Sequence, residues 1–440
     1  MNLITQIKKH LGLDIAEHAY RYAIDPQFGY TQASKIPDRW VKTTCGYCSV
    51  GCGMLLGVKA NQIVSVRGDE THPVNEGKLC PKGLSEHYIL KAKNRAVHPL
   101  LKKSDGRFQS VSWPVALETM TSQWRAIQDR YGLDSVAVLS TGQLLTEEFY
   151  TLGKLARLGM GVKHFDGNTT LCMSSAVAGY KQSFGSDGPP GSYKGLETAD
   201  LIVLIGANIA DNHPILWYRL LKNQHKKLIV IDPRKTKTAM FADLYLPIRP
   251  RSDVALFNGL LHLVIKKDGI AHDFVQQHTV GYEALKQHVL SFTPERVAEL
   301  TGLSVRDIEA CALAIMQSKN VFFSWTMGVN QSTQGTDTVS LINTLALVTG
   351  NVGRTGAAPM SITGQCNAMG TREFGFTASM PGYRSYDNAF ERQQLAQIWG
   401  TRPEQLPTER GWAYPDIIDG IYCGQIKALW VIGTNPLVSF

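Results

Sequence analysis

The spacing of four cysteines constrains this chain more than any other feature of its sequence. Three stand on one short loop, as Cys45-x-x-Cys48-x-x-x-Cys52, and the fourth, Cys80, follows after a gap of 27 residues. Three thiolates on a tight loop and one brought from elsewhere can hold a single 4Fe–4S cluster. Glycines at 46, 51 and 53 would let the backbone curl around such a cluster. The spacing therefore predicts an iron–sulfur site.

Zinc is the nearest alternative for these four thiols. A structural zinc site usually has two separated cysteine pairs, or cysteine with histidine, and a three-cysteine loop with a distant fourth fits that pattern poorly. Disulfides belong to oxidising compartments, and the start of the chain has neither a signal-peptide pattern nor a twin-arginine pair. We therefore expect a reducing, cytoplasmic location, which suits an iron–sulfur cluster.

The charge balance limits the classes of partner. The 440 residues include 45 Lys and Arg against 37 Asp and Glu, a formal net charge of +8, without a basic run of the kind that binds nucleic acid. No apolar run approaches membrane-spanning length. The mild excess of positive charge suits anionic ligands such as phosphates or a small anion. Neither nucleic acid nor a membrane is therefore expected as a partner.

A nucleotide-binding pattern occupies residues 200–234. An apolar strand, a glycine turn, a helix over 213–223 and a second strand over 227–231 follow one another, with a carboxylate after the second strand. These are the parts of a dinucleotide site, although the single glycine disfavours NAD and a plain scaffold is the alternative. In such a site the turn at Gly206 would let the backbone approach a phosphate, and Asp232 would accept from the donors of a nucleotide.

The end of the chain repeats this design. Leu429 to Asn435 is a strand that runs into Gly-x-Asn, as Val203 to Asn208 does, so we expect a second nucleotide unit that stops at Phe440 without a further helix or strand. Elsewhere apolar strands alternate with helical periodicity, which indicates an α/β fold. The strands expected between these units cover 54–58, 63–67, 135–140 and 321–325, and the helices cover 146–158, 253–267, 304–317 and 335–349.

Three segments allow narrower expectations. Leu3, Ile7 and Leu11 recur at helical spacing near the start, which allows a packed helix or a docking arm. Ser304 and Asp307 form a helix cap, and Cys311 on the apolar face of the helix that follows is expected in the core. Residues 351–385 are rich in Gly, Thr, Ser and Pro, which suits a loop that lines a site.

The four cysteines and the Cys80-Pro-Lys-Gly sequence resemble the N-terminal iron–sulfur domain of the molybdopterin oxidoreductases, which include nitrate reductases, formate dehydrogenases and dimethyl sulfoxide reductases. The resemblance extends over about residues 38–440. It implies that Lys82 lies on the electron path between the cluster and a pterin. A solvated surface lysine is the alternative reading of Lys82.

The family likeness also implies a domain plan. A 4Fe–4S domain would be followed by two Rossmann-like α/β domains, one inserted in the other, and the C-terminal domain of relatives would be absent. The chain as written is then expected to bind iron but to hold molybdenum weakly. The expected ranges are 1–37 for an N-terminal extension, 38–98 for the cluster domain, 161–329 for the inserted domain, and 99–160 with 330–440 for the domain around it.

A second likeness lies at Cys172. The run Asn168-x-x-x-Cys172-Met173 resembles the molybdenum-ligand segment of nitrate reductases, and a thiolate is a soft donor suited to such a metal. A buried free cysteine is the alternative. Formate dehydrogenases usually have a histidine after this ligand, whereas methionine stands here. The likeness is therefore to the assimilatory nitrate reductases.

Two further segments, 325–331 and 363–373, resemble stretches that line the pterin and the substrate funnel. An arginine and an amide near an oxo-metal centre suit nitrate, which needs positive charge and hydrogen-bond donors. The alternatives are core filler for Met327 and a surface cation for Arg372. Relatives usually have proline after Gln365, where this chain has Cys366.

The function implied is molybdenum-dependent reduction of nitrate to nitrite by two electrons that enter through the cluster. The cofactors would be a 4Fe–4S cluster and molybdenum bis(molybdopterin guanine dinucleotide), and the electron donor an NADH flavoprotein subunit, ferredoxin or flavodoxin. A formate dehydrogenase-like enzyme and a non-catalytic iron–sulfur electron-transfer subunit remain alternatives. The expected catalytic residues are Cys172, Met327, Gln365, Arg372 and Lys82. The expected cofactor-binding residues are Lys82, Gln143, Asn168, Cys172, Gly206, Asn208, Asp232, Arg234, Asp253, Met327, Gln331 and Asn435, with Cys172 as the molybdenum ligand.

Overall fold

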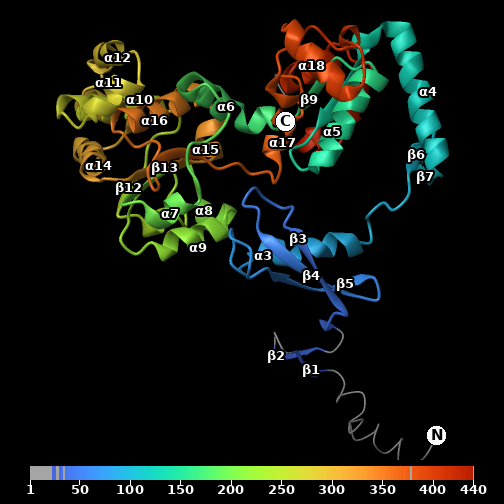
Figure 1. The fold of residues 1–440 in the computed structure, drawn as a ribbon, viewed down its shortest axis with the longest axis horizontal. Coiled ribbons are helices and arrows are strands. Elements are labelled where there is room, and N and C mark those ends of the chain that lie inside the picture. Colours follow the sequence, from blue (N-terminus) through green and yellow to red (C-terminus); the bar gives the residue numbers. More distant parts are fainter. Residues whose placement is uncertain (1–21, 26–28, 33–34, 377–378, 440) are drawn as a thin grey trace, which may run out of the picture. The chain divides into compact units, whose positions relative to one another are not determined.

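The computed structural model describes residues 22–25, 29–32, 35–376 and 379–439. The chain divides into two compact units, Met1–Arg95 and Ala96–Phe440 (Figure 1). The helix or docking arm expected around Leu3, Ile7 and Leu11 lies outside the described residues. Within them, no helix combines the length and the apolar character needed to cross a membrane.

The first unit is built on an antiparallel sheet in the order β3-β4-β5. The strands expected at 54–58 and 63–67 are confirmed as β4 and β5. Thr44 pairs with Gly53 across β3 and β4, so the three-cysteine loop spans the gap between these two strands. The elements of this unit are β1 (Tyr22–Asp25), β2 (Gly29–Gln32), β3 (Arg39–Thr44), β4 (Gly53–Lys59), β5 (Gln62–Gly68), α3 (Pro81–Ser85) and a 3-10 helix (Glu86–Lys91).

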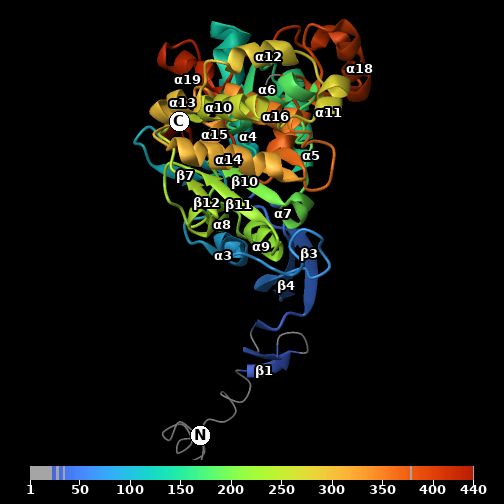
Figure 2. The ribbon, with the colours of Figure 1, turned by 90° about the vertical axis from the view of Figure 1, so that its left-hand side faces the viewer.

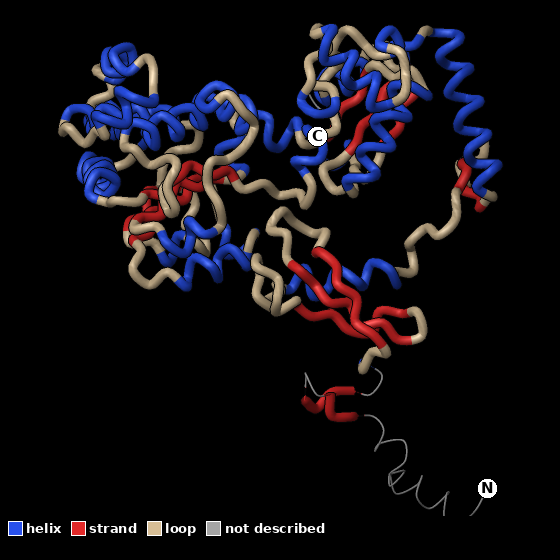
Figure 3. Tube along the Cα trace, viewed as in Figure 1, coloured by secondary structure: helices blue, strands red, loops and turns tan. Residues whose placement is uncertain are grey.

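A five-stranded sheet organises much of the second unit, and all its pairings are parallel, in the order β12-β11-β10-β13-β14. Figure 3 shows strands in red among the helices, in blue, that surround them. The strands are β10 (Leu201–Ile205), β11 (Lys227–Ile231), β12 (Leu244–Leu246), β13 (Val321–Trp325) and β14 (Ala358–Ser361). The expected strands at 227–231 and 321–325 agree with β11 and β13 residue for residue. β14 lies inside residues 351–385, which were expected to form a loop. It pairs with β13 of this sheet, although its residues were expected in the domain formed by 99–160 and 330–440.

Helices cover both faces of this sheet. Figure 2 shows α10, α14 and α16 on one side of the strands and α8 and α9 on the other. Leu201, Val203 and Ile205 of β10 share one apolar core with helices of the first group and with α6, because alternate residues of a strand point to the same face. The helices are α6 (Thr170–Phe184), α7 (Lys194–Thr198), α8 (Ile209–Asn212), α9 (Pro214–Lys222), α10 (Asp253–Lys266), α11 (His272–His278), α12 (Tyr282–Val289), α13 (Pro294–Thr301), α14 (Val305–Gln317), α15 (Met327–Asn330) and α16 (Gly335–Val348).

The expectations for α14 are confirmed. The backbone N–H of Asp307 donates to Ser304 Oγ at 3.1 Å, which caps the helix, and Ser304 is the residue before its first turn. Cys311 is fully buried in the core against the sheet. The helices expected at 213–223, 253–267 and 335–349 correspond to α9, α10 and α16, each with ends shifted by one residue or less.

A three-stranded parallel sheet, in the order β15-β8-β9, forms the rest of the second unit's framework. The expected strand at 135–140 is β8, and the helix expected over 146–158 is α5, which continues into a π-helical turn at Leu155–Gly159. β9 pairs with β8 and therefore belongs to this sheet, although its residues were expected in the inserted domain over 161–329. The elements are β6 (Leu100–Lys102), β7 (Phe108–Ser110), α4 (Trp113–Tyr131), β8 (Val136–Ser140), α5 (Thr146–Lys154), β9 (His164–Gly167), α17 (Ala368–Glu373), α18 (Ala389–Trp399), α19 (Tyr414–Tyr422) and β15 (Ala428–Val431).

One expectation about the chain's end is wrong. No helix was expected after the strand that reaches Asn435, but α20 (Pro436–Ser439) follows β15 through a turn at Gly433. Pro436 opens this short helix, which suits proline because the first helical position needs no N–H donor. The second unit therefore repeats the strand, glycine turn and helix sequence that follows β10.

Candidate functional site

The four cysteines of the first unit lie close enough to influence one another's pKa. Cys45, Cys52 and Cys80 are buried and Cys48 is half-buried. Burial first, and then the charges of the other three cysteines, raise the pKa of Cys52 to about 12. Burial likewise raises the pKa of Cys45 to about 12. Without a metal these buried thiols would stay protonated, whereas bound iron supplies the positive charge that stabilises thiolates.

A buried asparagine holds the two ends of this site together. Asn75 accepts from Gly53 N at 2.8 Å and donates to Gly53 O at 2.9 Å and to Lys78 O at 2.8 Å. The bonds join the end of the three-cysteine loop to the segment that leads into Cys80. Asn75 is not predicted from the sequence, because no local pattern shows which backbone groups an asparagine will reach.

Two charged residues flank the cysteines. Lys82 lies in the first turn of α3, its Nζ 5.2 Å from the Tyr47 ring centroid, and its charge counteracts the rise that burial causes in the pKa of Cys48. Glu86 Oε2 lies 3.3 Å from Cys45 Sγ and accepts from Gly46 N at 3.2 Å. Lys82 therefore lies within electrostatic range of Cys48, and its place on an electron path stays a prediction.

In the second unit, the residues expected to bind the first nucleotide lie at the carboxyl edge of the five-stranded sheet. Strand order reverses between β10 and β13, and ligands of parallel sheets bind at such a switch point. Here the backbones of Gly206 and Gly328 touch, since Gly328 N donates to Gly206 O at 3.3 Å and Thr326 Oγ1 donates to the same oxygen at 2.7 Å. A Cβ on Gly206 would lie 2.8 Å from Gly328 Cα, so only glycine fits.

The polar residues at the same edge come from two neighbouring strands and a helix. Asn208 Oδ1 accepts from Thr238 Oγ1 at 2.9 Å, which ties the turn after β10 to the segment after β11. Asp232 Oδ1 accepts from Arg234 N at 2.9 Å, while the rest of Arg234 is exposed. Burial, and then the charge of Asp232, raises the pKa of Asp253. Asp232 therefore lies within electrostatic range of Asp253 at this edge.

The second set of expected nucleotide residues meets at the carboxyl edge of the three-stranded sheet. Asn168 Oδ1 accepts from Gly142 N at 3.3 Å, and its Nδ2 donates to Thr434 Oγ1 at 3.2 Å. These bonds join the segments after β8, β9 and β15. Gln143 follows Gly142 and Asn435 follows Thr434 in the chain, and both Gln143 and Asn435 are exposed.

Gln365 belongs to this second edge. Its Nε2 donates to Thr141 Oγ1 at 3.1 Å. Its Oε1 is buried and has no hydrogen-bond partner among the described residues. A buried acceptor without a partner costs free energy, which a bound ligand with a donor would recover.

Cys172 lies in the first turn of α6, half-buried, with its Sγ 3.2 Å from Met327 Sδ. Burial raises its pKa, while the nearby Gly364 backbone N–H, the Thr363 side chain and the positive charge of Arg372 counteract the rise. The structure therefore brings together Cys172, Met327, the 363–364 loop and Arg372. Gln331 joins the same region by donating from Nε2 to Leu171 O at 3.2 Å.

Arg372 is buried at 7% exposure and pairs with Asp187, whose side chain is 3% exposed. The reading of Arg372 as a surface cation is therefore wrong. Tyr383 also donates to Asp187, at 3.3 Å. Asp187 is not predicted from the sequence, since it stands in a Gly- and Pro-rich loop 185 residues before its partner and carries no local signal.

Asp166 is a second carboxylate that the sequence pattern does not reveal. It accepts from Gly167 N and Thr170 Oγ1, each at 2.8 Å, and from Tyr414 N at 2.6 Å. Burial raises its pKa to about 7. It joins β9 to the starts of α6 and α19, so it fixes the base of the helix that carries Cys172.

Comparison with known proteins assigns both units to one family. Residues 38–91 match the molybdopterin oxidoreductase Fe4S4 domain, and residues 95–440 match the molybdopterin oxidoreductase family. These two matches imply a 4Fe–4S cluster and a molybdopterin cofactor. The buried thiols, the glycine contact at the sheet edge and the unpaired Gln365 oxygen fit those groups.

Curated relatives carry several names. The chain is 39% identical to a nitrate reductase of Synechocystis sp. (90% of this chain, 57% of that protein) and 36% identical to the assimilatory nitrate reductase catalytic subunit of Bacillus subtilis (97% and 60%). It is 34% identical to an F420-dependent formate dehydrogenase subunit alpha of Methanocaldococcus jannaschii (91% and 58%). The chain thus spans little more than half the length of these relatives.

A solved structure shares the fold. The acetylene hydratase of Pelobacter acetylenicus matches with a TM-score of 0.72 at 22% identity, over 91% of this chain and 57% of that one. The parallel sheets with their N-terminal iron–sulfur domain are thus part of a larger known architecture. On the match of both family patterns, the chain belongs to the molybdopterin oxidoreductases, a family of nitrate reductase-like enzymes.

Proposed function

We propose that this chain reduces nitrate to nitrite, as an assimilatory nitrate reductase catalytic subunit or the part of one that it spans. The observation that carries the proposal is the cluster of groups around Cys172: its thiol lies 3.2 Å from Met327 Sδ, and residues 363 and 364 and the charge of Arg372 lie close enough to lower its pKa. A soft sulfur donor with a cation at hand suits a metal centre that acts on an oxyanion.

Named residues have separate roles in this proposal. The thiolate of Cys172 would be the protein ligand of molybdenum, and the four cysteines of the first unit would hold the 4Fe–4S cluster, with Lys82 beside it. Molybdenum bis(molybdopterin guanine dinucleotide), when bound, supplies the two-electron oxygen-atom chemistry. Its two nucleotides would lie at the carboxyl edges of the two parallel sheets. The residues proposed for them are Gly206, Asn208, Asp232, Arg234 and Asp253 at one edge, Gln143, Asn168 and Asn435 at the other, and Gln331 beside the α6 turn.

Orientation of nitrate falls to Arg372, Gln365 and Met327. Arg372 would contribute a positive charge that Asp187 partly neutralises, and the side-chain amide of Gln365 would contribute a hydrogen-bond donor. Met327 presents an apolar sulfur next to Cys172, which keeps water from that side of the thiol. Asp187 therefore holds Arg372 in place and limits how strongly the arginine attracts anions.

The residue after Cys172 favours nitrate over formate as the substrate. Met173 is buried at 5% exposure, and Asn330 Nδ2 donates to its Sδ at 3.3 Å. Neither its thioether nor the neighbouring amide can take up the proton that formate oxidation releases.

The electron donor and the cellular location both stay predictions. A periplasmic nitrate reductase of Desulfovibrio desulfuricans is among the relatives, so the family does not by itself fix a cytoplasmic location.

Three assays on the anaerobically purified, cofactor-loaded protein test the proposal. Nitrate reduction with a reduced viologen dye, formate oxidation with an acceptor dye, and metal content should be measured on one preparation. We expect nitrite formation, no formate oxidation, and molybdenum together with iron. Formate oxidation without nitrate reduction would show a formate dehydrogenase, and neither activity at full molybdenum and iron content would overturn the proposed reaction.

A further inference from the structure

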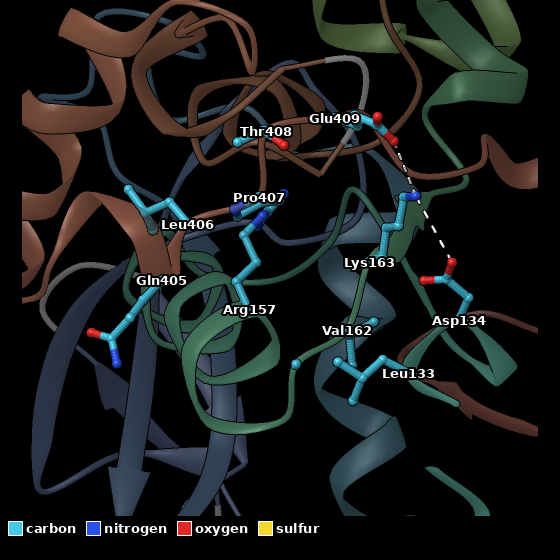
Figure 4. A pocket seen from close by; sticks show the side chains of 11 residues that line it. Leu133, Asp134, Arg157, Val162, Lys163, Gln405, Leu406, Pro407, Thr408 and Glu409 are labelled. Atoms are coloured by element: carbon cyan, nitrogen blue, oxygen red, sulfur yellow. Dashed lines mark hydrogen bonds and ion pairs between the residues drawn. The ribbon is translucent and has the colours of Figure 1, made fainter. Parts of the chain in front are cut away.

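A cavity of about 310 Å³ lies at the amino edge of the three-stranded sheet, opposite the edge assigned to a nucleotide (Figure 4). Its walls come from the segment before β8, the π-helical turn after α5, the segment before β9 and the loop at 405–409. In a parallel sheet the starts of neighbouring strands share one edge, so this cavity is separate from the proposed cofactor sites. Its volume suits a small molecule.

Arg157 brings a buried positive charge to this cavity. It is 6% exposed, and Figure 4 shows its guanidinium reaching toward Pro407. Its hydrogen bonds go to Gly375 O, to Gly153 O at 3.5 Å and to Tyr386 Oη at 3.3 Å, and its guanidinium carbon lies 5.2 Å from the Phe165 ring centroid. All of these partners are neutral.

No carboxylate among residues 35–376 and 379–439 lies within ion-pair distance of Arg157. Arginine keeps its charge in proteins, and a buried charge without a counter-ion is costly. Arg372, another strongly buried arginine of this unit, has Asp187 as its partner. Within the described ranges, Arg157 therefore lacks the anion that the fold supplies to Arg372.

The rest of the cavity suits the remainder of a small organic anion. Leu133, Val162, Leu406 and Pro407 provide apolar walls. At the mouth, Lys163 Nζ lies 3.3 Å from Glu409 and 3.9 Å from Asp134, whose side chains are 77% and 66% exposed. Exposed ion pairs of this kind are weak, so Lys163 can exchange them for a second anionic group.

We propose that this cavity binds a small aliphatic dicarboxylate, with one carboxylate on Arg157 and the other at Lys163. The planar guanidinium matches a carboxylate, the lysine adds a point charge at the mouth, and the apolar walls receive the carbon chain between the two acids. The proposal does not depend on the reaction at Cys172, because it rests on groups at the other edge of the sheet.

Titration calorimetry of the cofactor-loaded protein with succinate is the test, with acetate and inorganic phosphate as separate probes at constant ionic strength. We expect saturable succinate binding in the range of about 0.1–1 mM, with weaker binding of acetate, which lacks the second acid, and of phosphate, which cannot contact the apolar walls. Phosphate binding as tight as that of succinate would overturn the dicarboxylate assignment, and the absence of saturable succinate binding would overturn the site.

Three variants locate the binding. Arg157→Met should weaken succinate binding at least tenfold, and Lys194→Met, which removes an equal charge from a surface pair, should leave it unchanged. Because Arg157 also ties the π-helical turn to residues 375 and 386, its loss could unfold the protein. Thr408→Trp keeps Arg157 and fills the cavity, so it should abolish binding in a protein with normal iron content. Unchanged succinate affinity in Thr408→Trp would overturn the proposal.

Discussion

The sulfur atoms of Cys172 and Met327 lie 3.2 Å apart, although 155 residues separate them along the chain. Cys172 comes from the first turn of α6, and Met327 opens α15, two residues beyond the end of β13. The contact exists because α6 packs on the face of the sheet that β13 helps to form, with residues of both in one core. It places the proposed metal ligand at the carboxyl edge of the sheet, where the expected nucleotide residues also lie.

Cys172→Ala should abolish nitrate reduction while leaving the visible absorption of the iron–sulfur cluster unchanged. The metal would lose its protein ligand, but the cluster lies in the other unit. Cys311→Ala is the matched control, since this fully buried cysteine has no role in the proposal and should cost only about 1–2 kcal/mol of stability. Wild-type turnover by Cys172→Ala at equal molybdenum content would make Cys172 a core thiol.

Cys48→Ser should remove about four iron atoms per chain together with the broad visible absorption, because the cluster would lose one of its four ligands. Cys423→Ser removes an exposed thiol in the second unit and should change neither quantity. Iron analysis and an absorption spectrum decide the matter. Iron content that stays the same in Cys48→Ser would disprove the cluster assignment.

Replacement of Arg372 tests two effects at once. Arg372→Ala should raise the KM for nitrate roughly ten- to a hundredfold, as expected for about 1.5–3 kcal/mol of charge complementarity. It should also destabilise the fold by about 3–5 kcal/mol, because Asp187 would stay buried without a partner.

The double variant Arg372→Ala/Asp187→Asn separates these effects. Removing the second charge should restore much of the stability, since no unpaired carboxylate is left buried, but it should not restore the KM. Thermal midpoints and nitrate kinetics are the measurements. A double variant with a normal KM would show that Arg372 serves only the fold.

Asp166 should make the protein less stable as the pH rises from about 4 to about 7. Burial raises its folded-state pKa from 3.8 to about 7, so the folded chain holds a proton that the unfolded chain has lost. The stabilisation is present at low pH and is lost through this window, on the order of 2 kcal/mol between pH 5 and pH 8. Asp166→Asn should flatten this part of the pH profile of the denaturation midpoint, and an unchanged profile would contradict it.

Gly206→Ala should cost more stability than Gly400→Ala. Both glycines have a positive φ, of 53° and 66°, so both substitutions carry backbone strain of about 1 kcal/mol. A methyl group on Gly400 would meet no described atom within 4 Å, whereas one on Gly206 would lie 2.8 Å from the Gly328 backbone. Gly206→Ala should therefore also lower the guanine nucleotide content. Equal midpoints for the two variants would refute the close contact.

Much of the local structure could be predicted from the sequence. β11 and β13 agree with their expected ranges, and the Ser304 cap and the core position of Cys311 are confirmed. These features depend on apolar periodicity, turn residues and helix capping over a few neighbouring positions. The cysteine spacing also predicted the iron–sulfur domain, because three of the four ligands lie within one loop.

The sequence by itself therefore determined which segments become strands and helices, and which family of cofactors the cysteine pattern suits. Only the tertiary structure decided that Asp187 neutralises Arg372, that β14 joins β13 from within an expected loop, and that Arg157 is buried with no counter-ion among the described residues. The physical reason is distance along the chain. These partners are brought together by the order of parallel strands and by the burial of shared faces, and neither is encoded in any short stretch of residues.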